Sequence, residues 1–272
     1  MIRKLTVACA AILLFACSKY NQVRGPYAST NEIHKNKASW YAKQLATYPL
    51  ADSMSNSASF VGTTNFSMRA PNFVIIHHTA QDSVAQTLKT FTRPETQVSA
   101  HFVIGDDGTT YQMLNEYFRA HHAGLSKWGN NTDVNSCSIG IELDNNGKEN
   151  FSDAQIESLL ILLGKLKMKF KIPTANFIGH ADVAPKRKND PSKHFPWEKL
   201  AAQGFGYWYD TVNLTIPKNF DPIIGLRIIG YNTLKPDDAI EAYKIHFRQD
   251  NLSKTLTESD IKIIYSLMLK YQ

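Results

Sequence analysis

The run Phe73-Val74-Ile75-Ile76-His77-His78 decides the fold of this chain. Four apolar residues stand shortly after Pro71, and the run ends abruptly at two histidines. A short, unbroken apolar run next to a helix-breaking proline is typical of a buried strand. The sequence therefore predicts a strand that delivers two histidines at its carboxyl end.

Other stretches with strand character lie on the carboxyl side of this run. They are a hairpin, residues 101–104 and 109–113 joined by a turn, and two single strands, Ser138–Leu143 and Asn176–His180. Gly140 would permit a close approach of backbone to the first single strand, and Glu142 lies near the end of that strand. The last strand delivers His180.

Helical periodicity separates these strands. Val84, Leu88 and Phe91 recur at helical spacing, and Ser152 with Gln155 forms a capping-box pattern before a long amphipathic helix. The apolar positions of that helix are Ile156, Leu159, Leu160, Leu163 and Leu166. Alternating strands and helices predict an α/β fold with a mixed central β-sheet flanked by helices, which we assign to residues 69–210.

The pattern changes to short helices after about Thr211. Helices are expected over Phe220–Ile229, Asp237–Phe247 and Glu258–Leu269, and Thr257 opens the last one. Residues 211–272 are therefore expected to form a small all-α domain.

The amino terminus has the features of an export signal. Arg3 and Lys4 precede the apolar stretch Leu5–Leu14, which is too short to span a bilayer comfortably. Leu14-Phe15-Ala16-Cys17 resembles the lipobox of bacterial lipoproteins. Residues 1–16 would then be the signal peptide, Cys17 the lipidated first residue, and residues 17–68 a polar tether without a sustained helical or strand period. The alternative is an ordinary signal peptide.

A lipidated Cys17 predicts attachment to a membrane through the lipid. Ser18 stands where an aspartate retains some lipoproteins in the inner membrane, so we expect an outer-membrane lipoprotein that faces the periplasm. Loss of Cys9 with the signal and acylation of Cys17 leave only Cys137, so no disulfide within the chain is expected.

The charge of the chain is mildly basic. Removal of Arg3 and Lys4 lowers the formal net charge of +6 by two, which suits an anionic envelope polymer. The run Lys186-Arg187-Lys188 is too short, in an exported chain without a nucleic-acid-binding motif, to predict a nucleic-acid partner.

Histidines at two strand ends and one carboxylate suggest a metal centre. His77, His180 and Asp190 would supply three ligands and leave a position open, which is the arrangement of catalytic zinc sites. Each histidine by itself is more often structural or exposed to solvent, so the prediction depends on the other features of the chain.

Five motifs in this order resemble those of the zinc-dependent N-acetylmuramoyl-L-alanine amidases, a family shared with phage lysozyme-type amidases and peptidoglycan recognition proteins. They are Ile75–Ala80, Ser99–His101, His122–Gly124, Ser138–Glu142 and Gly179–Pro191. The resemblance runs from about residue 70 to the end, and its most specific part is the block from His180 to Asp190. The lipobox and the helical tail are similar to those of the outer-membrane lipoprotein subgroup.

The resemblance assigns roles residue by residue. It implies that His77, His180 and Asp190 bind Zn²⁺, which would acidify a water molecule and polarise the scissile carbonyl. Glu142 would take the proton of the water and pass it to the leaving amine, and Lys188 would stabilise the oxyanion. The alternatives are a solvated carboxylate at a strand end and a solvated basic run, in which Lys186 and Arg187 contribute surface charge or substrate steering.

Contacts with the substrate are less defined. The resemblance places His101 and His122 near the substrate groove, although either could serve only as a hydrogen-bonding group of the scaffold. His121 and Ser136 depart from the family, which often has tryptophan and aspartate there. The helical tail resembles a peptidoglycan-binding three-helix domain, although Asp250–Thr257 departs from the usual glycine-containing loop, and a purely structural cap is the alternative.

The resemblance implies hydrolysis of the amide bond between N-acetylmuramic acid and L-alanine, in peptidoglycan or in its muropeptide fragments, during cell-wall turnover or recycling. One alternative is a non-catalytic peptidoglycan recognition protein, which generally lacks the complete set His77, His180, Asp190 and Glu142. A second is a zinc carboxypeptidase or endopeptidase that cuts elsewhere in the stem peptide.

Overall fold

The computed structural model describes residues 25–46 and 63–272. These residues fall into two units, one ending at Thr64 and one formed by Asn65–Gln272, and each is described by itself. The predicted signal peptide, Cys17 and the stretches 18–24 and 47–62 of the predicted tether lie outside the described residues. No helix among the described residues is long and apolar enough to cross a membrane.

The first unit contains a single helix, α1, which spans Ala28–Leu45. None of its side chains is buried, and Ile33, Trp40 and Leu45 are more than half exposed. This stretch of the predicted tether is helical although its sequence has no sustained helical period. Ala, Lys, Gln and Leu are good helix formers, so α1 forms without the apolar stripe that periodicity detects.

The second unit contains a five-stranded mixed sheet in the order β3-β2-β4-β1-β5. Its strands are β1 (Phe73–His78), β2 (Phe102–Ile104), β3 (Thr110–Gln112), β4 (Ser138–Leu143) and β5 (Phe177–Gly179). Only β3 runs antiparallel to its neighbour, with which it forms the predicted hairpin. The predicted α/β fold with a mixed sheet is confirmed.

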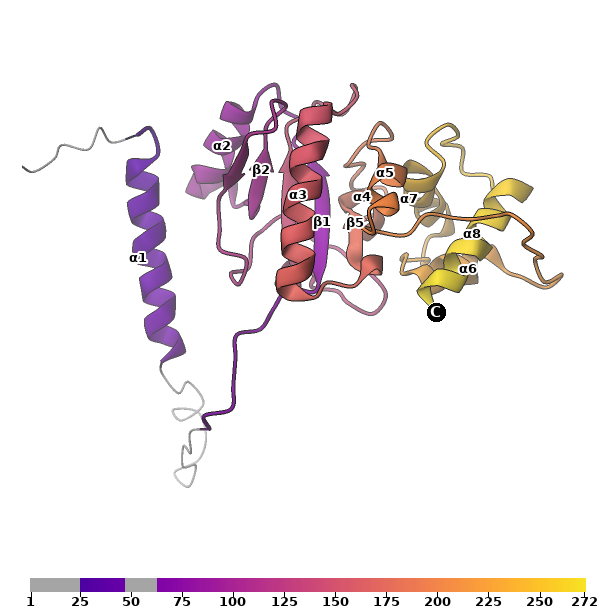
Figure 1. Cartoon of the computed structure of the whole chain (residues 1–272), viewed down its shortest axis with the longest axis horizontal. Coiled ribbons are helices and arrows are strands. Elements are labelled where there is room, and N and C mark those ends of the chain that lie inside the picture. Colours follow the sequence, from indigo (N-terminus) through magenta and orange to yellow (C-terminus); the bar gives the residue numbers. More distant parts are fainter. Residues whose placement is uncertain (1–24, 47–62) are drawn as a thin grey trace, which may run out of the picture. The chain divides into compact units, whose positions relative to one another are not determined.

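One face of the sheet is covered by α3, which spans Asp153–Phe170 and crosses in front of the strands in Figure 1. Ile139 and Ile141 of β4 share one apolar cluster with Leu159 and Leu163 of α3. Ser152 caps the helix by accepting a hydrogen bond from the Gln155 amide, as the capping-box pattern predicts. Acidic residues at the start of a helix and lysines at its end oppose its macrodipole, and α3 follows this rule with Asp153 and Lys169.

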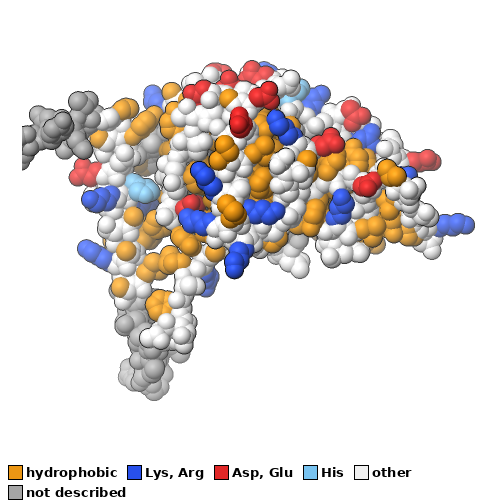
Figure 2. Space-filling view, viewed as in Figure 1, with side chains coloured by type: hydrophobic (Ala, Val, Ile, Leu, Met, Phe, Trp, Pro, Cys, Tyr) orange, Lys and Arg blue, Asp and Glu red, His pale blue; other side chains and the backbone are white. Residues whose placement is uncertain are grey.

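Charge of both signs covers the face seen in Figure 2. Lys and Arg side chains gather over its middle, and Asp and Glu side chains lie along its upper edge.

Short elements connect the strands. The helices are α2 (Val84–Thr92), α4 (His180–Val183) and α5 (Trp197–Ala202), and 3-10 turns span Pro94–Thr96, Val134–Ser136 and Thr174–Asn176. The prediction that residues 176–180 end a strand at a histidine holds with one adjustment, because His180 is already the first residue of α4.

The helical tail consists of α6 (Pro222–Ile229), α7 (Pro236–Phe247) and α8 (Glu258–Tyr271), close to the predicted bounds. Thr257 and Asp260 form the predicted capping box at the start of α8. Leu226 and Tyr243 of the tail belong to the same apolar cluster as Ile75 and Ile178 of the sheet. The tail therefore closes the core on the face of the sheet opposite α3, and the predicted domain boundary at residue 211 stays a prediction.

Candidate active site

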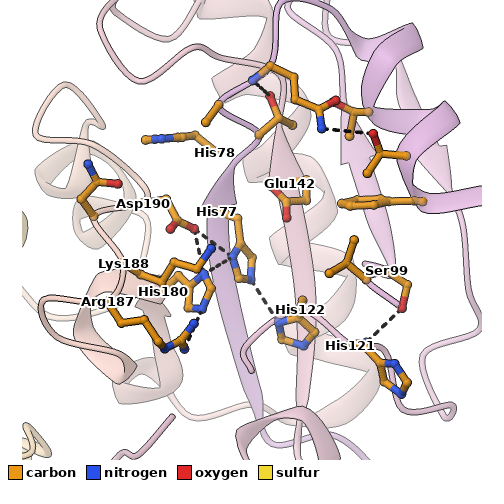
Figure 3. Close-up of a pocket in the computed structure, with 18 residues that line it drawn as sticks. His77, His78, Ser99, His121, His122, Glu142, His180, Arg187, Lys188 and Asp190 are labelled. Atoms are coloured by element: carbon orange, nitrogen blue, oxygen red, sulfur yellow. Dashed lines mark hydrogen bonds and ion pairs between the residues drawn. The ribbon is translucent and has the colours of Figure 1, made fainter. Parts of the chain in front are cut away.

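His77, His180 and Asp190 meet at the carboxyl ends of two neighbouring strands. His77 is the fifth residue of β1, and His180 directly follows β5, which pairs with β1 in parallel. The parallel pairing aligns Ile76 with Gly179, so the two histidines leave the sheet side by side. Asp190 reaches them from the loop after α4, and its segment is fixed by a hydrogen bond from the Ala181 amide to the Asp190 carbonyl. Figure 3 shows the three side chains converging.

Three donor atoms form a nearly equilateral triangle. His77 Nδ1 lies 2.9 Å from His180 Nδ1, and each nitrogen lies 3.0 Å from Asp190 Oδ2. Ligand atoms around one tetrahedral zinc ion are about 3.3 Å apart, given bonds of about 2.0–2.2 Å. All three residues are buried, and together they are the group with metal-binding geometry in the described part of the chain. The triangle fits a single zinc ion that retains an open position.

The charge states of these residues also suit a cation. Burial lowers the pKa of His77 to about 4, and repulsion from His180 acts in the same direction, so His77 is neutral at pH 7. Burial opposes ionisation of Asp190, but the close contacts of its carboxylate with His180 and His77 outweigh it and hold the pKa of this carboxyl far below its usual range. A neutral imidazole and an ionised carboxylate are the forms in which these residues bind a metal.

Glu142 lies beside His77 because β1 and β4 pair in parallel with these two residues in register. Its Oε2 atom is out of contact with solvent and has no hydrogen-bond partner. Burial raises the pKa of Glu142 to about 8, Asp190 adds to the rise, and Lys188 opposes it. A buried carboxylate oxygen without a partner is costly in a purely structural role, whereas a general base needs such an oxygen.

Lys188 is exposed on the loop between α4 and Asp190. In Figure 3 its side chain extends across the triangle toward His77. Its charge lowers the pKa of both His77 and Glu142, which places the ammonium group within electrostatic reach of both. A cation at this position can stabilise negative charge that develops next to the metal site.

A pocket of about 370 Å³ opens over these residues. It is lined by His77, Glu142, His180, Lys188 and Asp190, and also by residues of α2, by Ser99, by His121 and by the predicted substrate-side residue His122. The pocket therefore brings together the predicted ligands, the predicted base and the predicted oxyanion-binding lysine.

His101 does not line this pocket, and its predicted contact with substrate stays a prediction. The side chain is fully buried, its Nδ1 accepts a hydrogen bond from the Gly140 amide, and its Nε2 lies 3.0 Å from the Phe118 carbonyl. Both ring nitrogens are thus used by the backbone. His101 stabilises β4 and the loop near residue 118. This is the alternative role, as a hydrogen-bonding group of the scaffold.

Arg187 has a role that the basic run did not indicate. Its guanidinium donates to the Ala123 and Leu125 carbonyls at 2.6 Å each. Adjacent Gly124 has a positive φ of 56°, and a Cβ there would stand 3.3 Å from the guanidinium. Arg187 thus holds the loop at residues 123–125 against the segment that carries Lys188 and Asp190.

Asp182 is a second residue whose role no sequence pattern indicated. It is almost fully buried in α4, and its Oδ2 accepts hydrogen bonds from the Gly179 amide and from His246 Nδ1, at 2.7 and 2.8 Å. Its Oδ1 accepts a 2.7 Å hydrogen bond from the Tyr231 hydroxyl. His246 also stacks on Trp197, with 3.8 Å between ring centroids. The helical tail is therefore bonded directly to the helix that begins with His180.

The sequence of this chain matches those of known proteins. Residues 67–193 match the family model described as N-acetylmuramoyl-L-alanine amidase. The chain is 33% identical over 231 residues to N-acetylmuramoyl-L-alanine amidase AmiD of Escherichia coli, an alignment that spans 73% of this chain and 82% of the relative.

Two solved structures are also similar over most of both chains. One is the E. coli AmiD complex with the substrate anhydro-N-acetylmuramic acid-L-Ala-D-gamma-Glu-L-Lys, with a TM-score of 0.67, 29% identity, and coverage of 77% of this chain and 93% of that one. The other is AmpDH3 of Pseudomonas aeruginosa in complex with anhydromuramic pentapeptide, with a TM-score of 0.66, 27% identity, and coverage of 80% and 98%.

The mixed sheet with a pocket at its carboxyl edge is an α/β architecture, and the similar proteins of known activity are amidases. The chain belongs to the N-acetylmuramoyl-L-alanine amidase family, as its motifs predict. It is an enzyme that hydrolyses the amide bond between N-acetylmuramic acid and L-alanine, so the alternative of a non-catalytic recognition protein is set aside.

Proposed function

We propose that this amidase binds one zinc ion through His77, His180 and Asp190 and acts on soluble muropeptides that carry an anhydro-muramyl end. The observation that carries the metal assignment is the triangle of His77 Nδ1, His180 Nδ1 and Asp190 Oδ2, with sides of 2.9–3.0 Å. The substrate assignment is supported by the anhydro-muramyl peptides bound in the two similar solved structures.

The residues of the pocket divide the chemistry among them. A zinc ion at this site supplies Lewis acidity, which lowers the pKa of water and polarises a carbonyl. Glu142 Oε2, which has no hydrogen-bond partner, accepts the proton of the attacking water and returns it to the nitrogen of the leaving L-alanine. The Lys188 ammonium stabilises negative charge on the carbonyl oxygen.

The experiment that tests this function uses a purified anhydro-muramyl tripeptide and the chain lacking residues 1–17. Mass spectrometry of the products should show free stem peptide that begins at L-alanine. A chelator should abolish the reaction, and added zinc should restore it. A new amine within the stem peptide would instead identify a carboxypeptidase or endopeptidase, and retained turnover in chelator would reject the zinc assignment. A parallel reaction with the ordinary muramyl form tests the anhydro preference, which equal rates would contradict.

We also propose that lipid on Cys17 anchors the enzyme to the outer membrane, facing the periplasm. The proposal rests on the lipobox Leu14–Cys17 and on Ser18 after it. Labelling with a radioactive fatty acid should mark the full chain and not the Cys17→Ala variant, and the label should follow the outer-membrane fraction. Equal labelling of the two chains, or label in the inner-membrane fraction, would contradict it.

Binding of the cell wall by the helical tail is a further part of this proposal. Ile224 and Ile228 lie one turn apart on α6 and are 49% and 40% exposed, and Leu234 after this helix is 83% exposed. These side chains would contact the polymer. Replacing all three with serine should reduce co-sedimentation with purified wall sacculi and leave hydrolysis of the soluble tripeptide unchanged. Unchanged sedimentation would favour the structural-cap alternative.

A further inference from the structure

A chain of hydrogen bonds leads from the backbone to the proposed ligand His77. The Ser138 hydroxyl donates to the Val134 carbonyl at 2.6 Å, and Ser138 Oγ lies 3.2 Å from His122 Nε2. The other ring nitrogen, His122 Nδ1, lies 3.0 Å from His77 Nε2. The contact between His77 and His122 is visible in Figure 3.

The chemistry of each group fixes the direction of this chain. A carbonyl oxygen can only accept, so the single Ser138 proton is used on Val134. The Ser138 oxygen must then accept from His122 Nε2, which therefore carries a proton. A second proton on His122 would place a buried cation beside a metal ion, which is costly. His122 Nδ1 is therefore an acceptor, and His77 Nε2 donates to it.

This direction leaves His77 with an unprotonated Nδ1, the atom that faces His180 and Asp190. We propose that Ser138 and His122 are positioning residues that hold His77 in the tautomer whose Nδ1 lone pair points into the metal site. The inference rests on the proposed function, because it concerns the same metal site. Groups that orient a histidine ligand in this way commonly affect metal affinity by about 10–100-fold.

The fold also fixes the position of the His122 side chain. The buried Asn135 accepts hydrogen bonds from the His122 and Ala123 amides, at 3.1 and 2.8 Å. The imidazole then packs on β4 at Gly140, where an added Cβ would lie only 2.4 Å from His122 Cγ. Ser138, Gly140 and Glu142 alternate along one face of β4. That face thus provides the end of the hydrogen-bond chain, the space for the imidazole and the proposed base.

Ala123 orients the second proposed histidine ligand, His180, in a similar way. The Ala123 carbonyl lies 3.1 Å from His180 Nε2, and since it can only accept, it places the proton on Nε2 and leaves Nδ1 for the metal. Two consecutive residues, His122 through its side chain and Ala123 through its carbonyl, therefore orient both histidine ligands. His122, which is expected near the substrate, lines the pocket, and its two ring nitrogens lie next to His77 and Ser138.

The test compares the zinc dissociation constants of the full wild-type chain and of its variants, measured by competition with a chelator. Ser138→Ala should weaken zinc binding about 10-fold or more. Ser266→Ala is the matched control, because Ser266 is equally buried and donates a 2.7 Å hydrogen bond to the Asp210 carbonyl, away from the site. It should leave zinc affinity unchanged.

A double-mutant cycle separates proton positioning from packing. In His122→Asn the amide oxygen can accept from His77 Nε2 without help from Ser138, so most of the zinc affinity should remain. Ser138→Ala added to this variant should then have no further effect. Equal losses in both backgrounds would mean that Ser138 contributes only packing, and the proposal would be overturned.

Nitrogen NMR of the metal-free chain gives a readout independent of zinc. His77 should be protonated at Nε2 in the wild type and in Ser266→Ala, and a mixture of tautomers should appear in Ser138→Ala. A wild-type chain without affinity for zinc would reject the proposed function. A wild type that binds zinc, with Ser138→Ala binding as tightly as Ser266→Ala, would reject this inference alone.

Discussion

Tyr231 donates a 2.7 Å hydrogen bond to Asp182, which lies two residues after His180 in the same short helix. Tyr231 directly follows the turn at the end of α6, so this contact crosses from the helical tail to the segment that carries the proposed ligand His180. Tyr231→Phe should lower the free energy of unfolding by about 1–3 kcal/mol, because a buried carboxylate oxygen loses its donor. Urea unfolding with and without zinc measures the loss.

Tyr243→Phe provides the comparison for Tyr231→Phe. Tyr243 is also fully buried in the tail, but its hydroxyl makes only a 3.4 Å hydrogen bond to the Asp260 carbonyl. Its replacement should cost less than that of Tyr231. If both variants lost the same stability, the contact with Asp182 would have no special weight.

Glu142→Gln tests the proposed base. The substitution keeps the shape of the side chain and removes its ability to accept a proton, so turnover should fall by about 10²–10⁴-fold. Zinc content, measured by atomic absorption on the same preparation, should stay at the wild-type level because Glu142 is not among the proposed ligands. A variant that retained turnover would remove Glu142 from the mechanism.

Glu142 should also make the stability of the metal-free wild-type protein depend on pH. Burial raises the pKa of Glu142 from 4.5 to about 8, so the folded state holds this proton more tightly than the unfolded state does. Stability of the wild type should therefore fall as pH rises from about 4.5 to 8, by about 1.4 kcal/mol for each unit of difference in pKa. Glu142→Gln lacks this penalty.

Melting temperatures of both proteins in chelator at pH 5 and pH 8.5 measure the effect. The advantage of Glu142→Gln over the wild type should be larger at pH 8.5. An advantage that did not change with pH would contradict a raised pKa at this residue.

Lys188→Ala tests electrostatic stabilisation of the oxyanion. Loss of one group that stabilises a developing negative charge typically lowers kcat by about 10²–10³-fold. Lys193→Ala is the control, since Lys193 is exposed three residues beyond Asp190 and does not line the pocket. Steady-state rates on the same muropeptide distinguish them, and similar kcat values for the two variants would mean that Lys188 contributes only surface charge.

Much of the fold could be predicted from sequence because its elements have clear local signals. Strand β1 is an apolar run that ends at two histidines, and α3 and α8 begin at recognisable caps, Ser152 and Thr257. Helix α1 escaped prediction because it has no buried residue and so no apolar stripe. Periodicity detects helices that pack, whereas α1 depends on the helix propensity of its residues.

The proposed ligands could be named by resemblance, but the contacts that support them could not. A local pattern does not show whether a histidine faces a pocket or the backbone, so the sequence places His101 and His122 alike near the substrate groove, although only His122 lines the pocket. Asp182 gives no local signal, since its partners Tyr231 and His246 lie 49 and 64 residues further along the chain. Such contacts are set by the packing of the tail on the sheet.

Gly140→Ala tests the effect of filling the space beneath His122. The new Cβ would stand 2.4 Å from His122 Cγ, so the imidazole must move away from His77 or the strand must shift. Overpacking of this kind costs about 1–3 kcal/mol, and displacement of His122 should also weaken zinc binding.

Gly164→Ala is the control, because a Cβ at that position in α3 meets no atom within 4 Å. It should raise stability by about 0.5–1 kcal/mol, since alanine is the better helix former. Thermal unfolding and chelator competition on both variants provide the measurement. Normal zinc affinity in Gly140→Ala would mean that the imidazole of His122 can move without disturbing His77.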